Sequence, residues 1–209
     1  MKTLVIDYGS GNLRSAAKAL EATGFDVQVS SDPAAAAETE LLVLPGQGHF
    51  AQVAGGFRAS GFESAVRAHI AAGRPFLGIC VGLQLLFEGS EEAPGVPGLG
   101  LASGTVRRFR TRKVPQMGWN TLEAAEGPFA IFSGRHFYFV HSYYAPLTPH
   151  SVGVARYQGA AFTALYLRDN VVATQFHPEK SSAAGLAFLR ALKGYFEGVR
   201  ASRSSGRTR

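Results

Sequence analysis

The chain has 209 residues, of which 46% are hydrophobic and 17% charged, a composition typical of a globular protein with one well-buried domain. The net charge of +6 does not indicate a nucleic-acid-binding domain, because residues 198–209 carry four of the 21 basic groups and no acid, which leaves 17 basic against 15 acidic groups elsewhere. No apolar run approaches the ~18 residues of a membrane span, and the single cysteine excludes an internal disulfide, which fits a reducing cytoplasm.

We expect one domain over residues 1–197, because no internal repeat or linker interrupts this part of the chain. Residues 198–209 are rich in Ser, Arg and Gly and are expected to form a disordered basic tail. The chain begins with a short apolar run that ends at Asp7, which predicts a first strand rather than a signal peptide, so we expect a cytoplasmic location. The basic residues of the tail are Arg200, Arg203, Arg207 and Arg209.

The first part of the chain alternates short apolar runs with apolar residues at helical spacing. This β-loop-α alternation predicts an α/β fold with a largely parallel open sheet that is flanked by helices. The predicted strands cover residues 3–7, 25–29, 40–44 and 76–79, and the predicted helices cover residues 13–24, 50–59 and 62–72.

Ligands bind parallel sheets in the crevice beyond the carboxyl ends of the strands. Three loops of this sequence follow such strand ends, at residues 8–12, 45–50 and 80–84. We therefore expect these loops to meet at one binding site.

The only cysteine lies where a strand pattern changes into a helical one. The sequence Gly78-Ile79-Cys80-Val81-Gly82 places it between small residues, as a nucleophile at a sharp and strained turn requires. The N-terminus of a following helix favours a thiolate and, later, an oxyanion. A lone cysteine is also common as a small buried core residue, so other parts of the chain must decide between the two.

After residue 90 glycines and prolines interrupt regular structure, and short strand-like segments follow. Such runs, separated by turns, predict antiparallel additions to the sheet. An amphipathic helix over residues 181–196 is expected to close the chain. The strand-like segments cover residues 101–109, 137–140, 151–156, 162–167 and 171–175. A basic cluster, interpreted either as a partner-facing patch or as a solvated strand edge, comprises Arg107, Arg108, Arg110, Arg112 and Lys113.

A second candidate for chemistry stands at the end of the last predicted strand, where His177, Pro178 and Glu179 follow one another. Pro178 favours an extended conformation for His177, and residues two apart in an extended chain project to the same side. An imidazole held by a carboxylate is what a thiol nucleophile needs as its base. The alternative is a helix entry, with Glu179 in the first turn.

These stretches resemble a known family. Residues 78–84 (GICVGLQ) and 176–179 (FHPE) resemble class I, triad-type glutamine amidotransferases, which have a flavodoxin-like fold. Residues 7–13 (DYGSGNL), 113–120 (KVPQMGWN), 138–143 (YFVHSY) and 177–181 (HPEKS) narrow the resemblance to the glutaminase subunits of imidazole glycerol phosphate synthase, from histidine biosynthesis. The resemblance runs from residue 3 to about residue 196.

The resemblance implies that Cys80 attacks the side-chain amide of glutamine to give a glutamyl thioester. His177 would protonate the leaving ammonia and then activate water, while Glu179 holds the imidazole. The oxyanion would be met by the Val81 N–H and by a backbone N–H of the turn that contains Gln47 and Gly48, although Gln47 departs from the small apolar residue expected there. The implied glutamine contacts are Gly48, Gln84, Glu92, Ser142 and Tyr143, of which Glu92 is otherwise interpreted as a surface acid.

The resemblance also implies a partner, a separate (β/α)8-barrel cyclase subunit that forms a heterodimer with this chain and consumes the ammonia. Together they would convert glutamine and a phosphoribulosyl-formimino carboxamide ribotide into imidazole glycerol phosphate, an aminoimidazole ribotide and glutamate. No metal or cofactor is implied. The candidate docking residues are Asn12, Trp119, Asn120, Tyr138 and Lys180; for Trp119 the alternative is ordinary core packing.

Three other functions remain open at this point. The chain could be the glutaminase of another synthase, such as that of vitamin B6, which shares the triad but does not require residues 113–120 as written. It could be a non-catalytic module of the same fold that docks a partner, although Cys80, His177 and Glu179 are all present. A nucleic-acid-binding role would rest on the basic tail alone.

Overall fold

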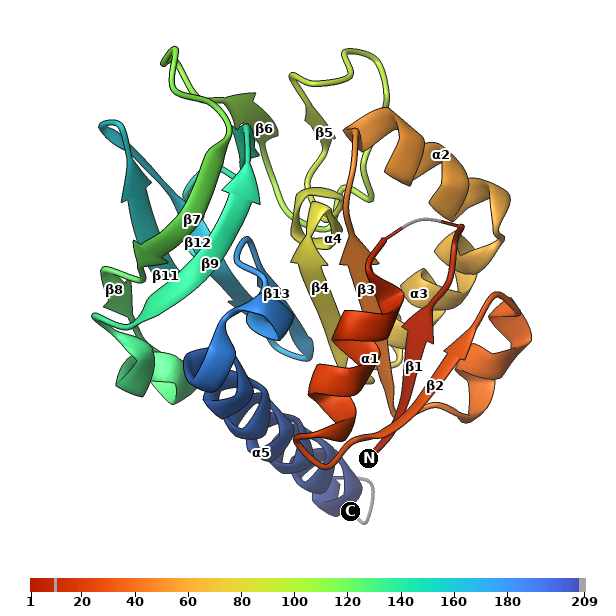
Figure 1. Cartoon of the computed structure of the whole chain (residues 1–209). Helices are drawn as coiled ribbons and strands as arrows, with labels where there is room; N and C mark the ends of the chain where they lie inside the picture. Colours follow the sequence, from red (N-terminus) through yellow and green to blue (C-terminus); the bar gives the residue numbers. More distant parts are fainter. Residues whose placement is uncertain (10, 207–209) are drawn as a thin grey trace.

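An eight-stranded sheet forms the centre of the protein (Figure 1). The structure is a computed structural model that describes residues 1–9 and 11–206. Five strands are parallel and three antiparallel strands extend them on one side, as expected for the predicted α/β class. The spatial order is β2 (Asp26–Ser30), β1 (Lys2–Ile6), β3 (Leu41–Gly46), β4 (Phe76–Cys80), β13 (Val171–Thr174), β12 (Ala160–Arg168), β11 (Ser151–Tyr157) and β8 (Ala124–Ala125).

Helices cover both faces of the parallel strands, as a parallel sheet buried on both sides requires. One face is covered by α1 (Leu13–Glu21) and α5 (Ser182–Gly206), and the other by α2 (Phe50–Ala59) and α3 (Phe62–Ala71) (Figure 1). The remaining helical elements are short, namely η1 (Pro33–Glu38), α4 (Val81–Gln84), η2 (Gly127–Phe132) and η3 (Pro178–Lys180).

The later strands pair differently from the prediction, because a strand pattern does not identify the partner strand. Residues 171–175 were expected to be antiparallel, but β13 runs parallel to β4. Residues 137–140 fall in β9 (His136–His141), which pairs with β7 (Gln116–Thr121) in a separate two-stranded sheet. The segment at 101–109 contributes β6 (Thr105–Arg108), which forms a small sheet with β5 (Gly89–Ser90) and β10 (Tyr143–Tyr144).

Strand β7 was not predicted, because its large apolar residues are exposed and a polar residue is buried, the reverse of an ordinary surface strand. Met117 and Trp119 are 66% and 53% exposed, whereas Gln116 is buried. Trp119 lies directly opposite Tyr138 on β9, and their rings meet edge to face at 6.3 Å between centroids. The outer face of this two-stranded sheet is therefore apolar, and core packing as the role of Trp119 is wrong.

A cluster of phenylalanines fastens α5 to the segment before His177. Phe137 of β9 stacks on Phe176 with 4.2 Å between ring centroids, and Phe176 meets Phe188 of α5 edge to face at 5.2 Å. All three side chains are fully buried. Burying a Phe stabilises a protein by about 2 kcal/mol or more. The packing of these three rings therefore stabilises the position of the backbone beside His177.

Helix α5 continues to Gly206 and so passes the expected start of a disordered tail at residue 198. An established helix is easier to extend than to nucleate, and Arg200 forms an ion pair with Glu40 at the N-terminal end of the sheet. Residues 207–209, and with them Arg207 and Arg209, lie outside the described residues.

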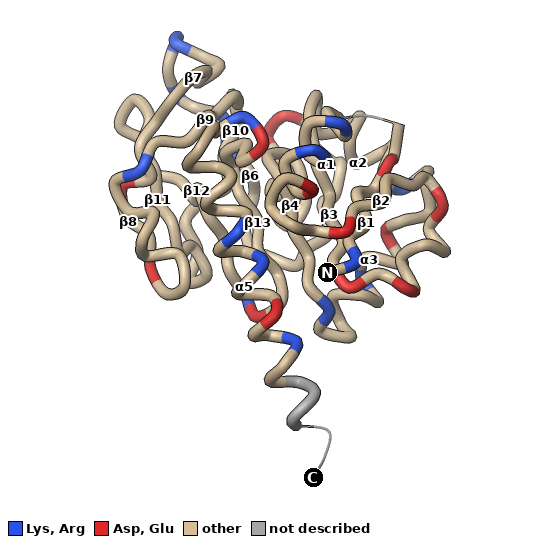
Figure 2. The backbone as a smooth tube through the Cα atoms, turned by 60° about the horizontal axis from the view of Figure 1, so that its bottom comes forward, with Lys and Arg blue, Asp and Glu red and all other residues tan. Residues whose placement is uncertain are grey.

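Basic and acidic residues are interspersed over the body (Figure 2). In the basic cluster, Arg110 pairs with Glu91 at 3.3 Å, and the backbone N–H of Arg108 donates to the same carboxylate at 2.9 Å. The side chain of Arg110 is 82% exposed, which favours a solvated strand edge. In the described part of the chain, no helix combines the length and the apolar character that crossing a membrane requires.

The buried His69 makes stability depend on pH. Its Nε2 lies 2.9 Å from the Pro75 carbonyl, and burial lowers its pKa to about 4. In the unfolded chain the His69 imidazole becomes protonated near pH 6.5, whereas in the folded chain it stays neutral down to about pH 4. The contribution of the buried, neutral His69 to stability is therefore present above pH 6.5 and is lost as the pH falls toward 4.

Between pH 7 and pH 4.5, we predict that the unfolding free energy of the wild type falls by about 1–2 kcal/mol more than that of His69→Gln. Urea unfolding followed by circular dichroism at both pH values measures this. His136→Gln, at an exposed histidine of β9, is the control and should follow the wild type. Equal acid losses in all three proteins would contradict the assignment.

Candidate active site

The turn from β4 into α4 holds Cys80 in a strained conformation. Its φ of 55° lies in the left-handed region, which costs a non-glycine residue about 1–3 kcal/mol. A Cβ on Gly78 would lie 2.7 Å from the Gly82 carbonyl oxygen, and one on Gly82 would overlap the Leu44 carbonyl oxygen of β3. Only glycine fits at both positions, so the small residues around Cys80 are what allow this sharp turn to close.

The parallel pairing of β13 with β4 brings the second motif to the cysteine. Thr174 lies beside Ile79 in the register, and the chain continues past Cys80 to His177. The Nδ1 of His177 is 2.8 Å from Oε1 of Glu179, and both side chains are buried. His177 itself is extended, as predicted, while Glu179 lies in the short helix η3, so the expected imidazole–carboxylate pair and the helix entry occur together.

Strand β9 fixes the backbone of His177. The N–H of His177 donates to the Tyr138 carbonyl at 2.9 Å. The fully buried Ser181 hydroxyl accepts from the Tyr138 N–H at 2.9 Å and donates to the His177 carbonyl at 2.6 Å. Both the N–H and the carbonyl of His177 are therefore hydrogen-bonded, which fixes the backbone that carries the imidazole.

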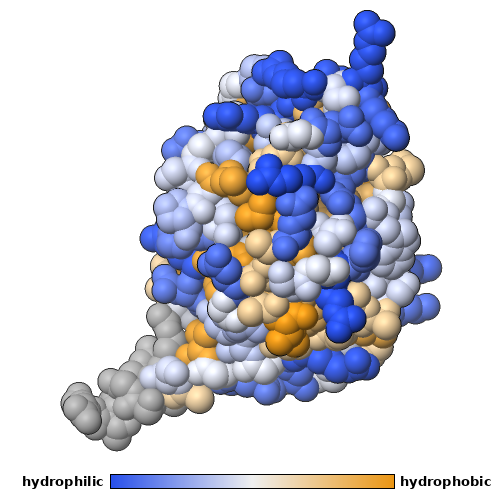
Figure 3. All heavy atoms as spheres, turned by 90° about the vertical axis from the view of Figure 1, so that its left-hand side faces the viewer, coloured by the Kyte–Doolittle hydropathy of each residue, from blue (hydrophilic) through white to orange (hydrophobic). Residues whose placement is uncertain are grey.

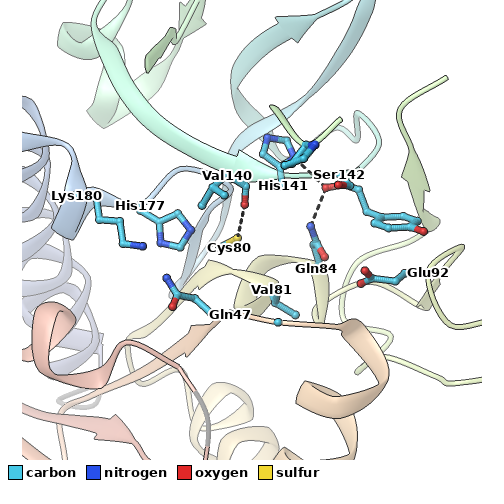
Figure 4. Close-up of a pocket in the computed structure, with 13 residues that line it drawn as sticks. Gln47, Cys80, Val81, Gln84, Glu92, Val140, His141, Ser142, His177 and Lys180 are labelled. Carbon is cyan, nitrogen blue, oxygen red and sulfur yellow. Dashed lines mark hydrogen bonds between the residues drawn. The ribbon is translucent and has the colours of Figure 1, made fainter. Parts of the chain in front are cut away.

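The charges around His177 favour its protonated form. Burial lowers its pKa, but the negative charge of Cys80 as a thiolate and the hydrogen-bonded Glu179 carboxylate outweigh this and raise the pKa to about 10. The ring lies beside the sulfur (Figure 4), and Nε2 has no hydrogen bond of ordinary geometry to the described residues. A thiolate at Cys80 would therefore be paired with the His177 imidazolium by charge.

These groups open into a cavity of about 410 Å³. Figure 4 shows Lys180 and Glu92 toward opposite ends of it, with Cys80 between them. In the described residues, no group of three or more His, Cys, Asp and Glu side chains is arranged to hold a metal ion. The lining consists of Gln47, Gly48, Cys80, Val81, Gln84, Glu92, Pro115, Val140, His141, Ser142, Tyr143, His177 and Lys180.

All the residues proposed for the oxyanion and the substrate lie at this cavity. Gly46 pairs with Cys80 in the register, and a Cβ there would lie 2.6 Å from the Gly82 nitrogen, so the turn with Gln47 and Gly48 adjoins the start of α4. Gly48 has a φ of 112°, which explains the glycine. The side chain of Gln47, larger than the expected residue, faces the cavity (Figure 4).

Two polar side chains of the cavity are held in place by backbone groups. One amide hydrogen of Gln84 is donated to the Tyr143 carbonyl at 2.9 Å. Glu92 accepts at 2.8 Å from the N–H of Phe50, the first residue of α2, where the helix dipole favours a negative charge. Glu92 is half-buried and lines the cavity, so it is more than a surface acid.

The candidate docking residues lie in different parts of the molecule. Trp119 and Tyr138 lie on the outer face of the β7–β9 sheet, and Lys180 lies at the cavity. The amide of Asn120 is used inside the chain, because it donates to the Arg156 carbonyl at 2.9 Å and accepts from the Thr121 N–H at 2.8 Å. Asn12 is half-buried immediately before α1.

Four residues at the site were not expected from the sequence. Pro115, Val140 and His141 line the cavity, and Gln175 contacts the sulfur of Cys80. The first three lie within stretches that carried the family resemblance. Gln175 becomes recognisable only from the pairing of β13 with β4.

Comparison with known proteins identifies close relatives. The glutamine amidotransferase class-I family profile matches residues 4–191. The chain is 65% identical over 197 residues to imidazole glycerol phosphate synthase subunit HisH of Thermus thermophilus, covering 94% of this chain and 99% of that protein. It is 52% identical over 196 residues to the subunit of the same name from Deinococcus radiodurans, covering 90% and 91%. A solved glutamine amidotransferase matches in fold, with a TM-score of 0.72 at 23% identity, covering 93% of this chain and 100% of the other.

The strain at Cys80 predicts an inverted order of two substitutions. Both Cys80→Ala and Cys80→Gly remove the sulfur, but only glycine adopts a φ of 55° without a steric cost. We expect Cys80→Gly to be more stable than Cys80→Ala by about 1 kcal/mol, measured by urea unfolding. As the control, Ala54→Gly in the interior of α2 should be less stable than the wild type by about 1 kcal/mol. An alanine variant as stable as the glycine variant would show that the turn relaxes without strain.

Proposed function

The chain belongs to the class I glutamine amidotransferases and, within them, to the HisH subunits of imidazole glycerol phosphate synthase, and from this premise we propose a residue-level mechanism for its site. Its function is that of the glutamine-hydrolysing subunit in histidine biosynthesis. The observation that carries the mechanism is the placement of Cys80 and the His177–Glu179 pair at one cavity.

In the first half of the reaction, the thiolate sulfur of Cys80 attacks the side-chain carbonyl carbon of glutamine. The carbonyl oxygen becomes an oxyanion, which accepts from the Val81 N–H and from a backbone N–H of the turn at Gln47 and Gly48. The imidazolium of His177 then gives its proton to the amide nitrogen. The carbon–nitrogen bond breaks, ammonia leaves, and a glutamyl thioester remains on the sulfur.

In the second half, the neutral His177 removes a proton from water. The resulting hydroxide attacks the thioester, the sulfur leaves as a thiolate, and glutamate is released with the imidazole protonated again. Glu179 keeps Nδ1 protonated and the ring oriented in both halves. Because His177 and Glu179 are both buried, the Glu179 carboxylate rather than solvent stabilises the imidazolium.

The shape of the cavity orients glutamine along its length. Glu92 at one end supplies a negative charge for the substrate ammonium, while Ser142 and Tyr143 offer polar groups beside Gln84. With the ammonium at Glu92, the side-chain amide reaches toward Cys80. The proposed steps use the side chains and backbone groups of this cavity. A cytoplasmic location stays a prediction.

The partner of this chain is the cyclase of the same synthase, and we propose that the two form a heterodimer through the outer face of the β7–β9 sheet. Met117 lies opposite Val140 and Trp119 opposite Tyr138 on its outer face, and Val140 also lines the catalytic cavity. An apolar face that adjoins the site lets a docked (β/α)8-barrel receive ammonia directly. In this arrangement Lys180 meets a carboxylate of the cyclase, with Asn12 and Asn120 at the edge of the interface.

The first prediction concerns the nucleophile. Cys80→Ala should abolish glutamine-dependent synthesis in the reconstituted pair and leave ammonia-dependent synthesis within about twofold of the wild type, because only the first uses the thiol. Product formation with either nitrogen source measures this. Glutamine turnover in the variant would show that Cys80 is not the nucleophile.

The second prediction concerns the partner. Glutamate release should rise at least about tenfold when a purified barrel cyclase and its ribotide ligand are added, because docking completes a site that opens onto the interface. Equal rates with and without the cyclase would retain the glutaminase and contradict the pairing. Equal stimulation by a vitamin B6 synthase would favour the other glutaminase interpretation.

The third prediction locates the interface. Trp119→Ala should raise the cyclase concentration needed for half-maximal stimulation by about tenfold or more, as for a buried aromatic at the centre of an interface. Ile131→Ala is the matched control, since Ile131 is 72% exposed but lies on η2, away from the cavity. A larger effect of Ile131→Ala than of Trp119→Ala would place the docking surface elsewhere. Figure 3 shows separate hydrophobic patches on the side of the molecule that lies on the left in Figure 1. Comparing the two variants therefore distinguishes docking on the β7–β9 sheet from docking at another exposed hydrophobic position.

A further inference from the structure

We propose that Gln175 donates a hydrogen bond to the Cys80 thiolate and couples the nucleophile to the segment that holds the substrate. The proposal rests on the function proposed above and adds a donor to its mechanism. Gln175 follows β13 directly and is fully buried. Its Nε2 lies 3.6 Å from the Cys80 sulfur, a normal separation for a hydrogen bond to sulfur.

The register of the sheet makes this contact a consequence of the fold. Parallel pairing of β13 with β4 ends with Thr174 beside Ile79, so the next residue of each strand is Gln175 and Cys80. The turn places Cys80 on the lining of the cavity, whereas Gln175 is fully buried and does not line it. The amide thus approaches the sulfur from the side of the sheet rather than from the solvent.

The hydrogen-bond network determines which end of the Gln175 amide faces the sulfur. The Tyr143 carbonyl can only accept, so Gln84 must point its NH₂ group toward it, at 2.9 Å. The same Gln84 nitrogen lies 3.2 Å from Oε1 of Gln175 and gives its second hydrogen there. Because Oε1 of Gln175 is used in this way, its NH₂ group must be the one that points at Cys80.

The far end of this relay is also anchored. The Nδ1 of His141 lies 2.9 Å from the Tyr143 carbonyl, which requires a hydrogen on that nitrogen. Burial lowers the pKa of His141 to about 3, so the ring stays neutral and keeps this tautomer. The Tyr143 carbonyl therefore accepts two hydrogen bonds, and its residue lines the substrate cavity.

The position of Gln175 suits the charge that develops on the sulfur. Before ionisation, the thiol can donate to the Val140 carbonyl, 3.9 Å away. Once the proton has moved to His177, the sulfur needs hydrogen-bond donors from the protein, since only 4% of Cys80 is exposed. His177 provides a charge on one side and Gln175 an N–H on another, so the thiolate is stabilised without solvent.

The test is the pH dependence of Cys80 alkylation by iodoacetamide, which reacts with the thiolate. Gln175→Met keeps the size of the side chain and removes the N–H donor. We expect its alkylation rate at pH 7 to fall about tenfold, with recovery to the wild-type plateau at higher pH, because a hydrogen bond to a charged group is lost. With glutamine and the cyclase, kcat should fall more than KM rises.

Thr174→Val is the matched control. It removes a buried hydrogen bond one residue away, from Thr174 to the Phe176 carbonyl at 2.8 Å, without touching the sulfur. Its alkylation profile should match that of the wild type. An alkylation profile of Gln175→Met that also matches the wild type would overturn the proposal, because a merely structural glutamine would lower stability and leave the thiolate unchanged.

A second variant covers failure of the first to fold. Gln175→Asn retains an amide but withdraws its N–H from the sulfur by one methylene, and it should show the same loss at pH 7 to a smaller degree. A wild-type alkylation profile in this variant would count against the donor. A wild-type protein that is alkylated normally but never releases glutamate, even with the cyclase, would instead overturn the proposed function.

Discussion

The close packing of backbone against backbone where β4 turns into α4 is the constraint on which the site depends. Gly82 lies against the Leu44 carbonyl of β3 with no room for a Cβ, and Cys80, two residues earlier, has a left-handed φ of 55°. The strain is sustained by the burial of β3 and β4 in the centre of the sheet. In return, the sulfur leaves the plane of the sheet and reaches the cavity at a helix N-terminus.

The rest of the site is arranged around that sulfur by elements from both halves of the chain. The parallel strand β13 delivers His177, and β9 holds the backbone of His177 through Tyr138 and Ser181. Tyr138 also belongs to the outer face of the β7–β9 sheet. A subunit that docks on this face would therefore contact the strand that positions His177, which connects the proposed interface physically with the proposed triad.

The sequence was sufficient for the parts of the fold that rest on local patterns. The alternation of strands and helices predicted the parallel strands, and the glycines around Cys80 predicted the turn. Pairing that depends on tertiary contacts escaped it: β13 was expected to be antiparallel, β7 has a polar inner face, and Gln175 gains its role only from its neighbour on β4. Helix α5 continued beyond its apolar stripe because helix extension and the Arg200–Glu40 pair outweigh a composition typical of disorder.

The central claim is that Cys80 carries the glutamyl group during turnover. Its most direct test is mass spectrometry of the complex after rapid acid quenching during glutamine hydrolysis, with peptide mapping of the adduct. The mechanism predicts a glutamyl adduct on the peptide that contains Cys80, which forms within the first turnover and disappears when glutamine is exhausted. Glutamate formation at full rate with no adduct, or with an adduct on another residue, would contradict it.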